Sequence, residues 1–328
     1  NVGTTVIETV ESDEKYDILV LELSSFQLHW LEDAQFVSSA ILNIAEDHVD
    51  WHGTFDAYAQ VKISLLDKSM TAILNADDGE IVSRTTHWQG RKVFFSLDTP
   101  APGEIGVVEE LLVDRAFVAD PQQASMICEL ADIVPTVPHN VSNALAAAAL
   151  ARAINVPHEA IQKALHDFRP GRHRIETVHE SAGITWVDDS KATNPHAAAA
   201  SLMSHLSVVW IAGGLAKGAD MDAMVERCAP RMKAAILIGT DRALIEAALI
   251  KHAPDLPRIL IDAPSDYVRG GASNSLMESI VTAAATVAQS GDAVLLAPAC
   301  ASMDQFVSYA DRGDRFAAAV RKVVAHEA

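Results

Sequence analysis

The stretch "WVDDSKATNPHA", Trp186 to Ala197, sets the fold class of the second half of the chain. An apolar, β-rich run from Ile184 to Val187 ends abruptly in two aspartates, a serine, a lysine and a threonine. An Asn-Pro pair then leads into alanines, which favour helix. In open α/β sheets, ligands bind at the carboxyl ends of strands, beside the N-termini of the following helices. The polar cluster is therefore either a ligand site or a simple helix cap formed by Asp189, Ser190 or Asn194.

Outward from this stretch, strands and helices alternate regularly. The expected elements are strand 184–188, helix 195–204, strand 207–212, helix 220–230, strand 234–239, helix 241–251, strand 258–261, helix 275–289, strand 292–297 and helix 312–325. Repeated βα units predict a Rossmann-like, doubly wound sheet. A boundary precedes them at "FRPGRHR", Phe168 to Arg174, where Pro170 and Gly171 break the helical pattern. We therefore expect a C-terminal domain at residues 171–328.

The first half, residues 1–170, has a less regular pattern. Its expected elements are strands Ile18 to Leu23, Val37 to Asn43 and Thr71 to Asn75, helix Phe55 to Leu66, short strands between Lys92 and Val118, and helices Val141 to Ile154 and His158 to His166. This order predicts an α/β domain with a mostly parallel sheet and a small antiparallel addition.

Composition narrows the class of protein. With 328 residues and 49% hydrophobic side chains, the chain can bury a substantial core. A formal charge of -19 without a basic stripe disfavours nucleic acid and anionic membranes as partners. Three unclustered cysteines fit a reducing cytosol, and no apolar stretch approaches the roughly 20 residues of a membrane span. We expect a soluble cytoplasmic protein, and the opening "NVGTT", which lacks methionine, predicts a fragment.

Charged groups lie at the ends of two predicted strands in the first half. In "LVLELSSFQL", Glu22 sits among strand-forming apolar residues, where an unpaired carboxylate would be costly. Glu22 therefore either meets a cation or lies at an exposed strand end. The next strand ends in "LNIAEDHVDWHG", which gathers Asp47, His48, Asp50 and His52. This cluster is either a plain loop or part of a divalent metal site.

Lys62 interrupts the apolar stripe of the helix "FDAYAQVKISLL". Tyr58, Val61, Leu65 and Leu66 form that stripe, and Lys62 lies four residues after Tyr58. The ammonium either extends to solvent along the stripe or is held inward for a function. The position of Lys62 favours the second interpretation slightly.

Three later stretches also place polar groups beside predicted helices or strand ends. "PHNVSNALAAAALA" puts His139, Asn140 and Asn143 at a helix start, where capping accounts for one of them. "IAGGLAKGAD" follows a buried strand with paired glycines and Lys217, and it does not match the dinucleotide fingerprint G-x-G-x-x-G. The stretch "APACASMDQFVSYADRGDRF" gathers Ser302, Asp304, Tyr309 and Arg312 after the last strand.

Taken in order, eight motifs resemble those of the Mur ligases. They are "ELSSFQL", "NIAEDHVDWHG", the helical Lys62, "HNVSNALAA", "GRHR", "DDSKATNP", "GGLAKGAD" and "PACASMDQF". The resemblance spans essentially the whole chain. It implies an ATP-dependent acid–amino-acid ligase of peptidoglycan synthesis, which forms an acyl phosphate that the amine of an amino acid attacks. "SSFQL" and "PACASMDQF" favour the branch that joins D-glutamate to UDP-N-acetylmuramoyl-L-alanine, and we expect a monomer.

The resemblance also implies roles for individual residues. Glu22 and His48 become Mg²⁺ ligands, and Lys62 becomes the lysine that reacts with carbon dioxide to give a carbamate, a third ligand; these three are the expected catalytic residues. The expected ATP contacts are Asn140, Asn143, Arg174 and Asp189, with Arg174 near phosphate and Asp189 near ribose. The residues expected to hold D-glutamate are Lys191, Thr193, Lys217, Ser302, Met303 and Tyr309. Asn1 is expected to contact the UDP-linked substrate.

One family motif is missing. No G-x-x-x-x-G-K-[ST] phosphate loop occurs in the chain, although the family carries one at the start of its central domain, upstream of the position that matches Asn1. The chain is therefore expected to be an incomplete central ATP-binding domain plus a complete C-terminal amino-acid-binding domain, inactive alone. The alternatives are another Mur ligase, a ligase like folylpolyglutamate synthase, or a non-catalytic binding protein on this scaffold.

Overall fold

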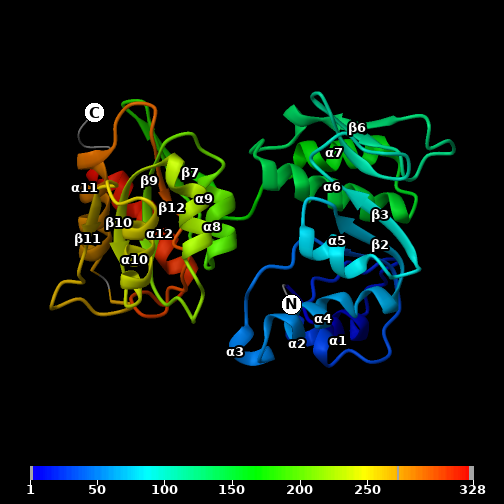
Figure 1. Cartoon of the computed structure of the whole chain (residues 1–328), viewed down its shortest axis with the longest axis horizontal. Coiled ribbons are helices and arrows are strands. Elements are labelled where there is room, and N and C mark those ends of the chain that lie inside the picture. The colour runs from blue at the N-terminus through cyan, green and yellow to red at the C-terminus, as the bar shows by residue number, and fades with distance from the viewer. Residues whose placement is uncertain (1–2, 272, 325–328) are drawn as a thin grey trace. The chain divides into compact units, whose positions relative to one another are not determined.

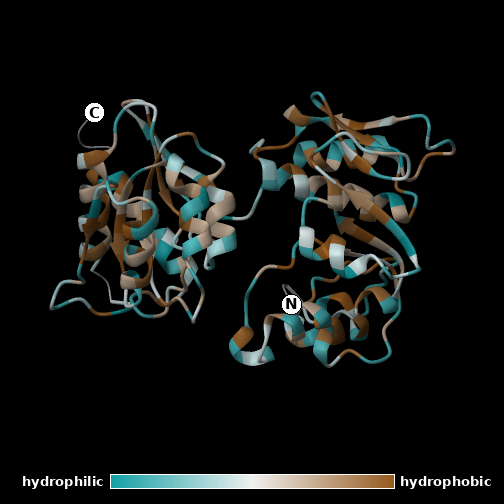
Figure 2. Cartoon of the chain, in the orientation of Figure 1, coloured by the Kyte–Doolittle hydropathy of each residue, from teal (hydrophilic) through white to brown (hydrophobic). Residues whose placement is uncertain are grey.

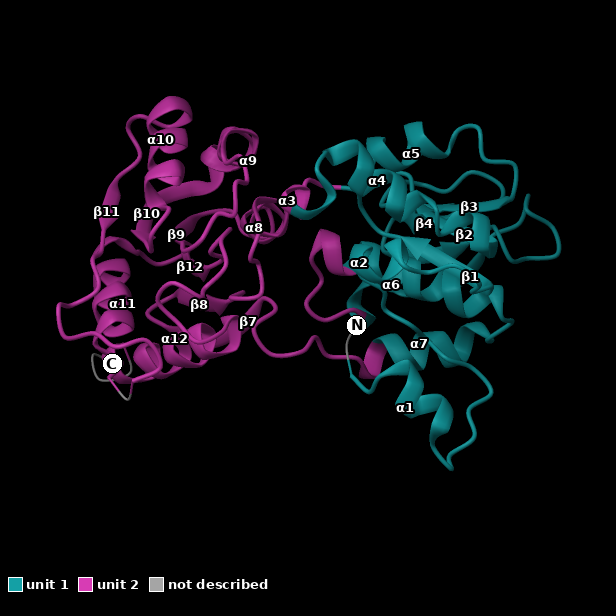
Figure 3. Ribbon diagram, turned by 90° about the horizontal axis from the view of Figure 1, so that it is seen from below, with its two compact units in different colours: residues 1–44, 51–132, 141–165 teal, residues 45–50, 133–140, 166–328 magenta. Residues whose placement is uncertain are grey.

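The computed structural model describes residues 3–271 and 273–324. Within them the chain divides into two compact units (Figure 3). Unit 1 comprises residues 3–44, 51–132 and 141–165, and unit 2 comprises residues 45–50, 133–140 and the described residues from 166 onward. Each unit is built around one six-stranded sheet.

The sheet of unit 2 has the strand order β11-β10-β9-β12-β8-β7. Its strands are β7 (Glu176–Ser181), β8 (Ile184–Asp188), β9 (Val208–Gly213), β10 (Met232–Ile238), β11 (Arg258–Leu260) and β12 (Ala293–Leu296). All neighbours pair in parallel except β7, which runs antiparallel to β8. The central strand β9 is buried along its whole length, as expected for a parallel sheet covered on both faces. Figure 2 shows apolar residues concentrated on these strands.

Helices cover both faces of this sheet (Figure 1). The elements on one face are α8 (Pro195–Leu202), α9 (Asp222–Cys228) and α10 (Arg242–His252), and those on the other are α11 (Ser275–Val287) and α12 (Tyr309–Val323). A short 3-10 helix, Ala229–Arg231, follows α9. Two separate apolar clusters fill the two sides, one with Leu202 and Leu249, the other with Ile280 and Phe316. The doubly wound fold predicted for the second half is confirmed.

The sheet of unit 1 has the order β1-β2-β3-β4-β5-β6. Its strands are β1 (Phe36–Ile41), β2 (Ser69–Asn75), β3 (Arg91–Phe95), β4 (Ile105–Val108), β5 (Leu111–Asp114) and β6 (Ser125–Glu129). Strands β1 to β4 pair in parallel, and β4, β5 and β6 pair antiparallel. The predicted parallel sheet with an antiparallel addition is therefore confirmed, with β6 as an extra strand.

The helices of the first half are mostly short. They are α1 (Val6–Glu11), α2 (Ser25–His29), α3 (Val49–His52), α4 (Phe55–Ile63), α5 (Gly79–Thr85), α6 (Pro138–Ala153) and α7 (His158–Asp167), with 3-10 helices Leu66–Lys68 and Leu130–Asp132. The helix expected to reach Leu66 ends at Ile63, and α1, α2, α3 and α5 were not expected. Strand β7 of the second half was not expected either. Within the described residues, the structure contains no helix that is long and apolar enough to cross a membrane.

The strand predicted at Ile18 to Leu23 is wrong. These residues lie outside any helix or strand, and Val20 is 88% exposed. A β-rich sequence becomes a strand only when a neighbour satisfies its main-chain groups, and β1 is the edge of the described sheet. Glu22, for which either a cation partner or an exposed strand end was expected, is exposed but lies in no strand.

Candidate functional site

The segments that follow β8, β9 and β12 at the carboxyl edge of the unit 2 sheet carry all six residues expected to hold the amino acid, five in loops and Tyr309 as the first residue of α12. The loops follow β8, β9 and β12, which are neighbours in the order β9-β12-β8 and run in parallel. The first loop carries Lys191 and Thr193, and the second carries Lys217. The residues after β12 are Ser302, Met303 and Tyr309. Because parallel strands end at the same edge, the topology brings these segments together.

Main-chain hydrogen bonds join the loops that follow β9 and β12. Leu215 and Ala301 exchange two bonds of 2.9 Å, and Gly213 N donates to Pro298 O at 2.8 Å. A Cβ atom on Gly214 would lie 2.1 Å from Ala301 O, so only glycine permits this approach. The close contact fixes the spacing between the segments that lead to Lys217 and to Ser302.

Arg312 joins the loops that follow β8 and β12. Its side chain is fully buried, and Nε donates to Ser190 Oγ at 2.9 Å while Nη2 donates to Ser190 O at 2.9 Å. Nη1 donates to Cys300 O at 3.2 Å. Burial lowers the pKa of Arg312 to about 10, which leaves the guanidinium charged at neutral pH. Arg312 therefore links the loop after β8 to the segment after β12 through buried hydrogen bonds.

Lys191 and Tyr309 meet at this edge although they are far apart in the sequence. The Lys191 ammonium lies 4.1 Å from the centroid of the Tyr309 ring, a cation–π contact. Ser190 Oγ donates to Tyr309 O at 2.7 Å, which ties the start of α12 to the loop after β8. The edge thus presents a lysine ammonium on an aromatic platform.

Two adjacent aspartates end β8, and both are buried. Asp189 accepts a hydrogen bond from Ile175 N at 3.3 Å, and burial raises its pKa to about 6. Asp188 accepts from Ser190 N at 2.9 Å and lies 2.7 Å from His173 Nδ1. Burial raises the pKa of Asp188, and its hydrogen bonds to His173 and Ser190 oppose that effect. The guanidinium-bearing residue Arg174 is exposed beside these groups.

Asn194 is the residue of "WVDDSKATNPHA" that caps the following helix. It is the N-cap of α8, and its side chain accepts from Ala197 N at 2.8 Å. Capping therefore requires neither Asp189 nor Ser190. The burial of two aspartates at a strand end needs a separate explanation.

In unit 1, the Lys62 side chain extends to the carboxyl end of β1. Its ammonium donates to Asn43 O at 2.6 Å and to the Tyr58 hydroxyl at 3.2 Å. The same ammonium lies 5.2 Å from the Tyr58 ring centroid. Tyr58 is buried and Lys62 is half-buried, so the amine meets polar groups inside the apolar stripe.

Histidines around α3 lie in an aromatic cluster or beside an acid. His52 Nε2 is 3.0 Å from Ser25 Oγ, and the His52 ring contacts Trp51 and Tyr58. His48 adopts a positive φ of 53° and lies 3.7 Å from Asp47. The role of His48 and Glu22 as partners of Lys62 in one metal site stays a prediction.

The proposed ATP contacts in α6 differ in their surroundings. Asn140 Nδ2 donates to Pro135 O at 2.9 Å, which supports the turn before the helix, and Asn143 is exposed. Burial lowers the pKa of His139, so this imidazole is neutral at neutral pH. Asn1 lies outside the described residues.

Comparison with known proteins identifies the family. Residues 3–151 match the Mur ligase middle domain, and residues 173–300 match the Mur ligase glutamate ligase domain. Two relatives named UDP-N-acetylmuramoylalanine–D-glutamate ligase, from Streptomyces avermitilis and Thermobifida fusca, are 48% and 49% identical over 327 residues. Each match covers 98% of this chain, and 68% and 69% of the two relatives. The chain belongs to the Mur ligase family.

Solved structures share the fold of this Mur ligase at low sequence identity. A pseudomurein peptide ligase type C from Methanothermus fervidus has a TM-score of 0.61 at 16% identity, covering 89% of this chain and 64% of the other. A bifunctional folylpolyglutamate synthase/dihydrofolate synthase from Yersinia pestis, complexed with AMPPNP and Mn ion, has a TM-score of 0.50 at 17% identity. That match covers 88% of this chain and 61% of the other.

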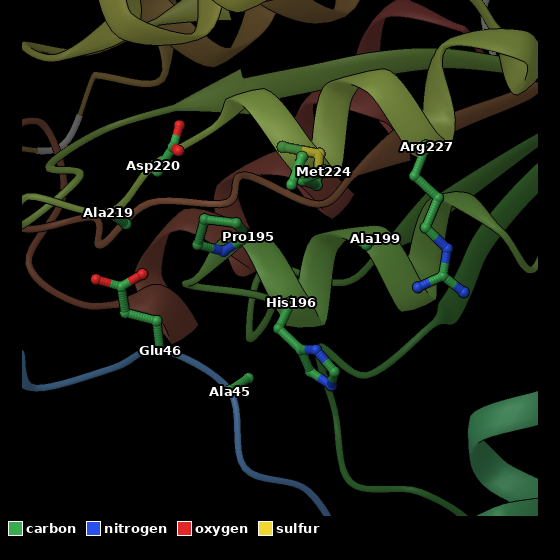
Figure 4. A pocket seen from close by; sticks show the side chains of 10 residues that line it. Ala45, Glu46, Pro195, His196, Ala199, Ala219, Asp220, Met224 and Arg227 are labelled. Carbon is green, nitrogen blue, oxygen red and sulfur yellow. The ribbon is translucent and has the colours of Figure 1, made fainter. Parts of the chain in front are cut away.

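A pocket of about 250 Å³ lies elsewhere in unit 2 (Figure 4). Residues of α8 and α9 line it together with Ala45 and Glu46, and its charged groups include Asp220 and Arg227. None of the predicted site residues of this Mur ligase lines the pocket. The residues expected to hold the amino acid therefore lie in the segments after β8, β9 and β12 and not in this pocket.

Two further candidate groups, the imidazole of His173 and the carboxylate of Asp188, were not predicted from the sequence. His173 lies in the motif "GRHR" and Asp188 in the motif "DDSKATNP". The one available signal was a second aspartate at a strand end, where a single capping residue would suffice. Their pairing depends on the antiparallel contact of β7 with β8, and β7 itself was not expected.

Proposed function

We propose that this chain is the greater part of an ATP-dependent ligase that adds D-glutamate to UDP-N-acetylmuramoyl-L-alanine in peptidoglycan synthesis. The observation that carries the proposal is the convergence of Lys191, Lys217 and Ser302 on three adjacent strand ends. It occurs in a chain almost half identical to two ligases named for that reaction. The chain spans about two thirds of the length of those relatives.

The composition of the strand-end loops suits an amino acid with two carboxylates. Lys191 and Lys217 each supply an ammonium, and charge-assisted hydrogen bonds to carboxylates are among the stronger ones in proteins. Thr193 and Ser302 add hydroxyl donors, and Met303 supplies apolar contact at 54% exposure. In a chain of net charge -19, such local positive sites are necessary to hold an acidic substrate.

The proposed cofactors are ATP and Mg²⁺. A carboxylate from Glu22, an imidazole from His48 and carbamate oxygens on Lys62 form a donor set that a divalent cation accepts. Bound Mg²⁺ would neutralise phosphate charge during transfer. Arg174 and Asn143 are exposed and so can donate to a nucleotide, and the resemblance to a ligase solved with AMPPNP and Mn supports this assignment.

The environment of Lys62 is compatible with a carbamate. As an amine, it donates to Asn43 O within the apolar stripe. A carbamate nitrogen keeps one N–H, which can still donate to Asn43 O, while the two new oxygens project beyond it. The reaction would therefore convert a held cation into a held anion without loss of its anchor.

A ligase assay tests the proposed function. The longest reading frame that contains this chain is assayed with ATP, Mg²⁺, UDP-N-acetylmuramoyl-L-alanine and a panel of amino acids. We expect product with D-glutamate, and a Lys217→Met variant with a KM for D-glutamate raised at least about tenfold through loss of a charge-assisted bond. Lys251→Met is the matched control because Lys251 pairs with Asp222 on the α9–α10 side. Product with another amino acid would instead indicate a sister ligase.

The second candidate function is that of a non-catalytic binding protein with the ligase fold. The sequence upstream of this chain distinguishes the two. An adjoining G-x-x-x-x-G-K-[ST] loop would supply the phosphate-binding group that residues 1–328 do not contain. A reading frame without that loop, together with ligand binding but no phosphate release, would favour the binding protein.

A further inference from the structure

His173 and Asp188 form a buried pair that the roles described above do not use. His173 is 5% exposed and Asp188 is fully buried, and Nδ1 and Oδ2 lie 2.7 Å apart. The second carboxylate oxygen, Oδ1, accepts from Ser190 N at 2.9 Å. Both oxygens of Asp188 therefore have partners, and the imidazole is fixed by a short hydrogen bond.

Gly313 makes the space for this pair. It lies inside α12, where glycine costs about 1 kcal/mol relative to alanine. A Cβ atom at this position would lie 2.2 Å from His173 Nδ1 and 2.5 Å from Asp188 Oδ2. The helix therefore carries a residue of poor helix propensity at the one point where the pair would collide with any larger side chain.

The His173–Asp188 pair contacts two residues that are proposed to hold the amino acid, Tyr309 and Lys191. The His173 ring packs edge-on against the Tyr309 ring, with centroids 6.2 Å apart and an interplanar angle of 79°. His173 O accepts from Lys191 N at 3.2 Å. Tyr309 in turn carries the Lys191 ammonium 4.1 Å from its ring centroid. His173 thus contacts the Tyr309 ring through its imidazole and the main chain of Lys191 through its own carbonyl oxygen.

A metal site is the other possible use of these groups. Ligand atoms of His173, Glu176 and Asp188 all lie within 4.8 Å of one another. Two ligands of a tetrahedral ion at about 2.1 Å would be separated by about 3.4 Å. The observed 2.7 Å between Nδ1 and Oδ2 is instead a hydrogen-bond distance. Glu176 Oε2 already accepts from His173 N at 2.9 Å, so the contacts favour a hydrogen-bonded network.

We propose that the His173–Asp188 pair is a positioning element that fixes Tyr309 as a platform for the Lys191 ammonium, which then meets a carboxylate of the acceptor amino acid. The inference rests on the proposed function, since D-glutamate is the acceptor there. A lysine held on a ring loses less side-chain freedom on binding than a free one, so part of the entropic cost of binding is removed in advance.

Lysine NMR on the whole chain tests the positioning directly. Reductive ¹³C-methylation keeps the charge of each lysine, and a Lys191→Arg variant assigns the Lys191 resonance. We expect that resonance to be shifted upfield by the Tyr309 ring, to keep its shift in Tyr309→Phe, and to lose it in Tyr309→Leu. Asp188→Ala should reduce the upfield shift, while Asp188→Asn, which retains an acceptor oxygen, should restore most of it.

Titration with D-glutamate then separates the inference from the function on which it rests. We expect Tyr309→Leu and Asp188→Ala to weaken D-glutamate binding roughly 2- to 30-fold, with Tyr309→Phe close to the parent. A parent chain that shows no Lys191 response to D-glutamate would contradict the proposed function. A parent that binds D-glutamate no better than Tyr309→Leu would overturn the inference alone.

The last measurement tests the metal-site alternative by adding zinc or EDTA and following the Lys191 resonance. Neither should move the Lys191 resonance, because the proposed pair contains no metal. A zinc-dependent change that disappears in Glu176→Gln would overturn the hydrogen-bonded pair in favour of a metal site. Tyr309 is 36% exposed, so Tyr309→Leu leaves the core intact and keeps the test independent of folding.

Discussion

Asp189 combines deep burial with a carboxylate at the ligand edge of a parallel sheet. Its pKa is about 6 in the folded chain against 3.8 for an ordinary aspartate. The folded state therefore binds more protons than the unfolded state between these values, so stability falls as pH rises from about 4 to 6. Above pH 6 the ionised Asp189 costs up to about 3 kcal/mol of the free energy of unfolding.

The Asp189→Asn variant tests that cost. We expect it to be more stable than the parent by about 1 to 3 kcal/mol at pH 7.5, because the amide is neutral and can still accept from Ile175 N. The advantage should shrink to nearly zero at pH 4. Urea unfolding at both pH values measures it. A gain that is the same at both values would mean that ionisation of Asp189 is not its cause.

Asp188 and Asp189 show which features of the site could be predicted from the sequence and which could not. Two charges at the end of an apolar run were compatible with a ligand site or a helix cap, because such groups are costly to bury without a partner. The partner of Asp188 could not be inferred, since His173 is 15 residues away and meets it only through the fold. Spacing along the chain predicts which edge a residue occupies, whereas hydrogen-bond partners require three-dimensional packing.

At the scale of a single element, the capping role of Asn194 in α8 can be tested separately from the proposed binding roles of Lys191 and Thr193. Asn194 accepts from Ala197 N, whereas Lys191 and Thr193 precede it in the loop. We expect Asn194→Ala to lower the free energy of unfolding by about 1 kcal/mol, and Asn194→Asp to keep most of it. D-glutamate affinity should change less than about twofold in Asn194→Asp. A large loss of affinity in that conservative variant would assign Asn194 to the ligand site.

Gly213, the last residue of β9, and Gly218, in the turn that follows, require glycine for different reasons. Gly213 has φ +121°, and its Cβ atom would lie 1.9 Å from Ile238 O, whereas Gly218 has φ +78° and open space around it. Gly213→Ala should therefore destabilise the fold by at least about 3 kcal/mol, from strain and collision together. Gly218→Ala should cost only about 1 kcal/mol, from strain alone. Thermal unfolding of the two variants makes the comparison, and equal losses would contradict the steric argument.

Elements were predictable where the sequence allowed one interpretation. The apolar run of β9 is bounded by turn residues and followed by a helix, which fits only a buried parallel strand. Residues 18–23 are equally β-rich, but a strand also requires a neighbour, and none pairs with them among the described residues. Strand β7 was missed because its partly exposed residues carry no strong apolar signal, and its place is set by pairing with β8.

At the scale of the whole molecule, the chain carries a large negative charge yet is proposed to bind three anionic ligands. The formal charge is -19, so the potential around it opposes ATP, the UDP-linked substrate and D-glutamate. Lys191 and Lys217 at the unit 2 edge, and the exposed Arg174, are the local exceptions. Affinity therefore depends on a few positive groups and not on a general field.

Because the chain contains few positive groups that could hold phosphates, we predict that residues 1–328 alone will not ligate D-glutamate. Transfer of the γ-phosphoryl group relies on a backbone cradle and a lysine that grips the β- and γ-phosphates, and the chain contains no G-x-x-x-x-G-K-[ST] motif. Loss of even one preorganised stabilising group commonly costs about 100- to 1000-fold in rate. The proposed binding of D-glutamate at the unit 2 edge should nevertheless persist, because the residues proposed to hold it lie within residues 1–328.

The measurement is phosphate release with ATP, Mg²⁺, UDP-N-acetylmuramoyl-L-alanine and D-glutamate, run beside the Streptomyces avermitilis relative, of which this chain covers 68%. We expect the chain to turn over at least about 100-fold more slowly than the relative. Turnover within about tenfold of the relative would contradict the prediction, because other groups in residues 1–328 would then have to bind the phosphates. Arg174, whose guanidinium is exposed at the edge of unit 2, would be the first residue to substitute.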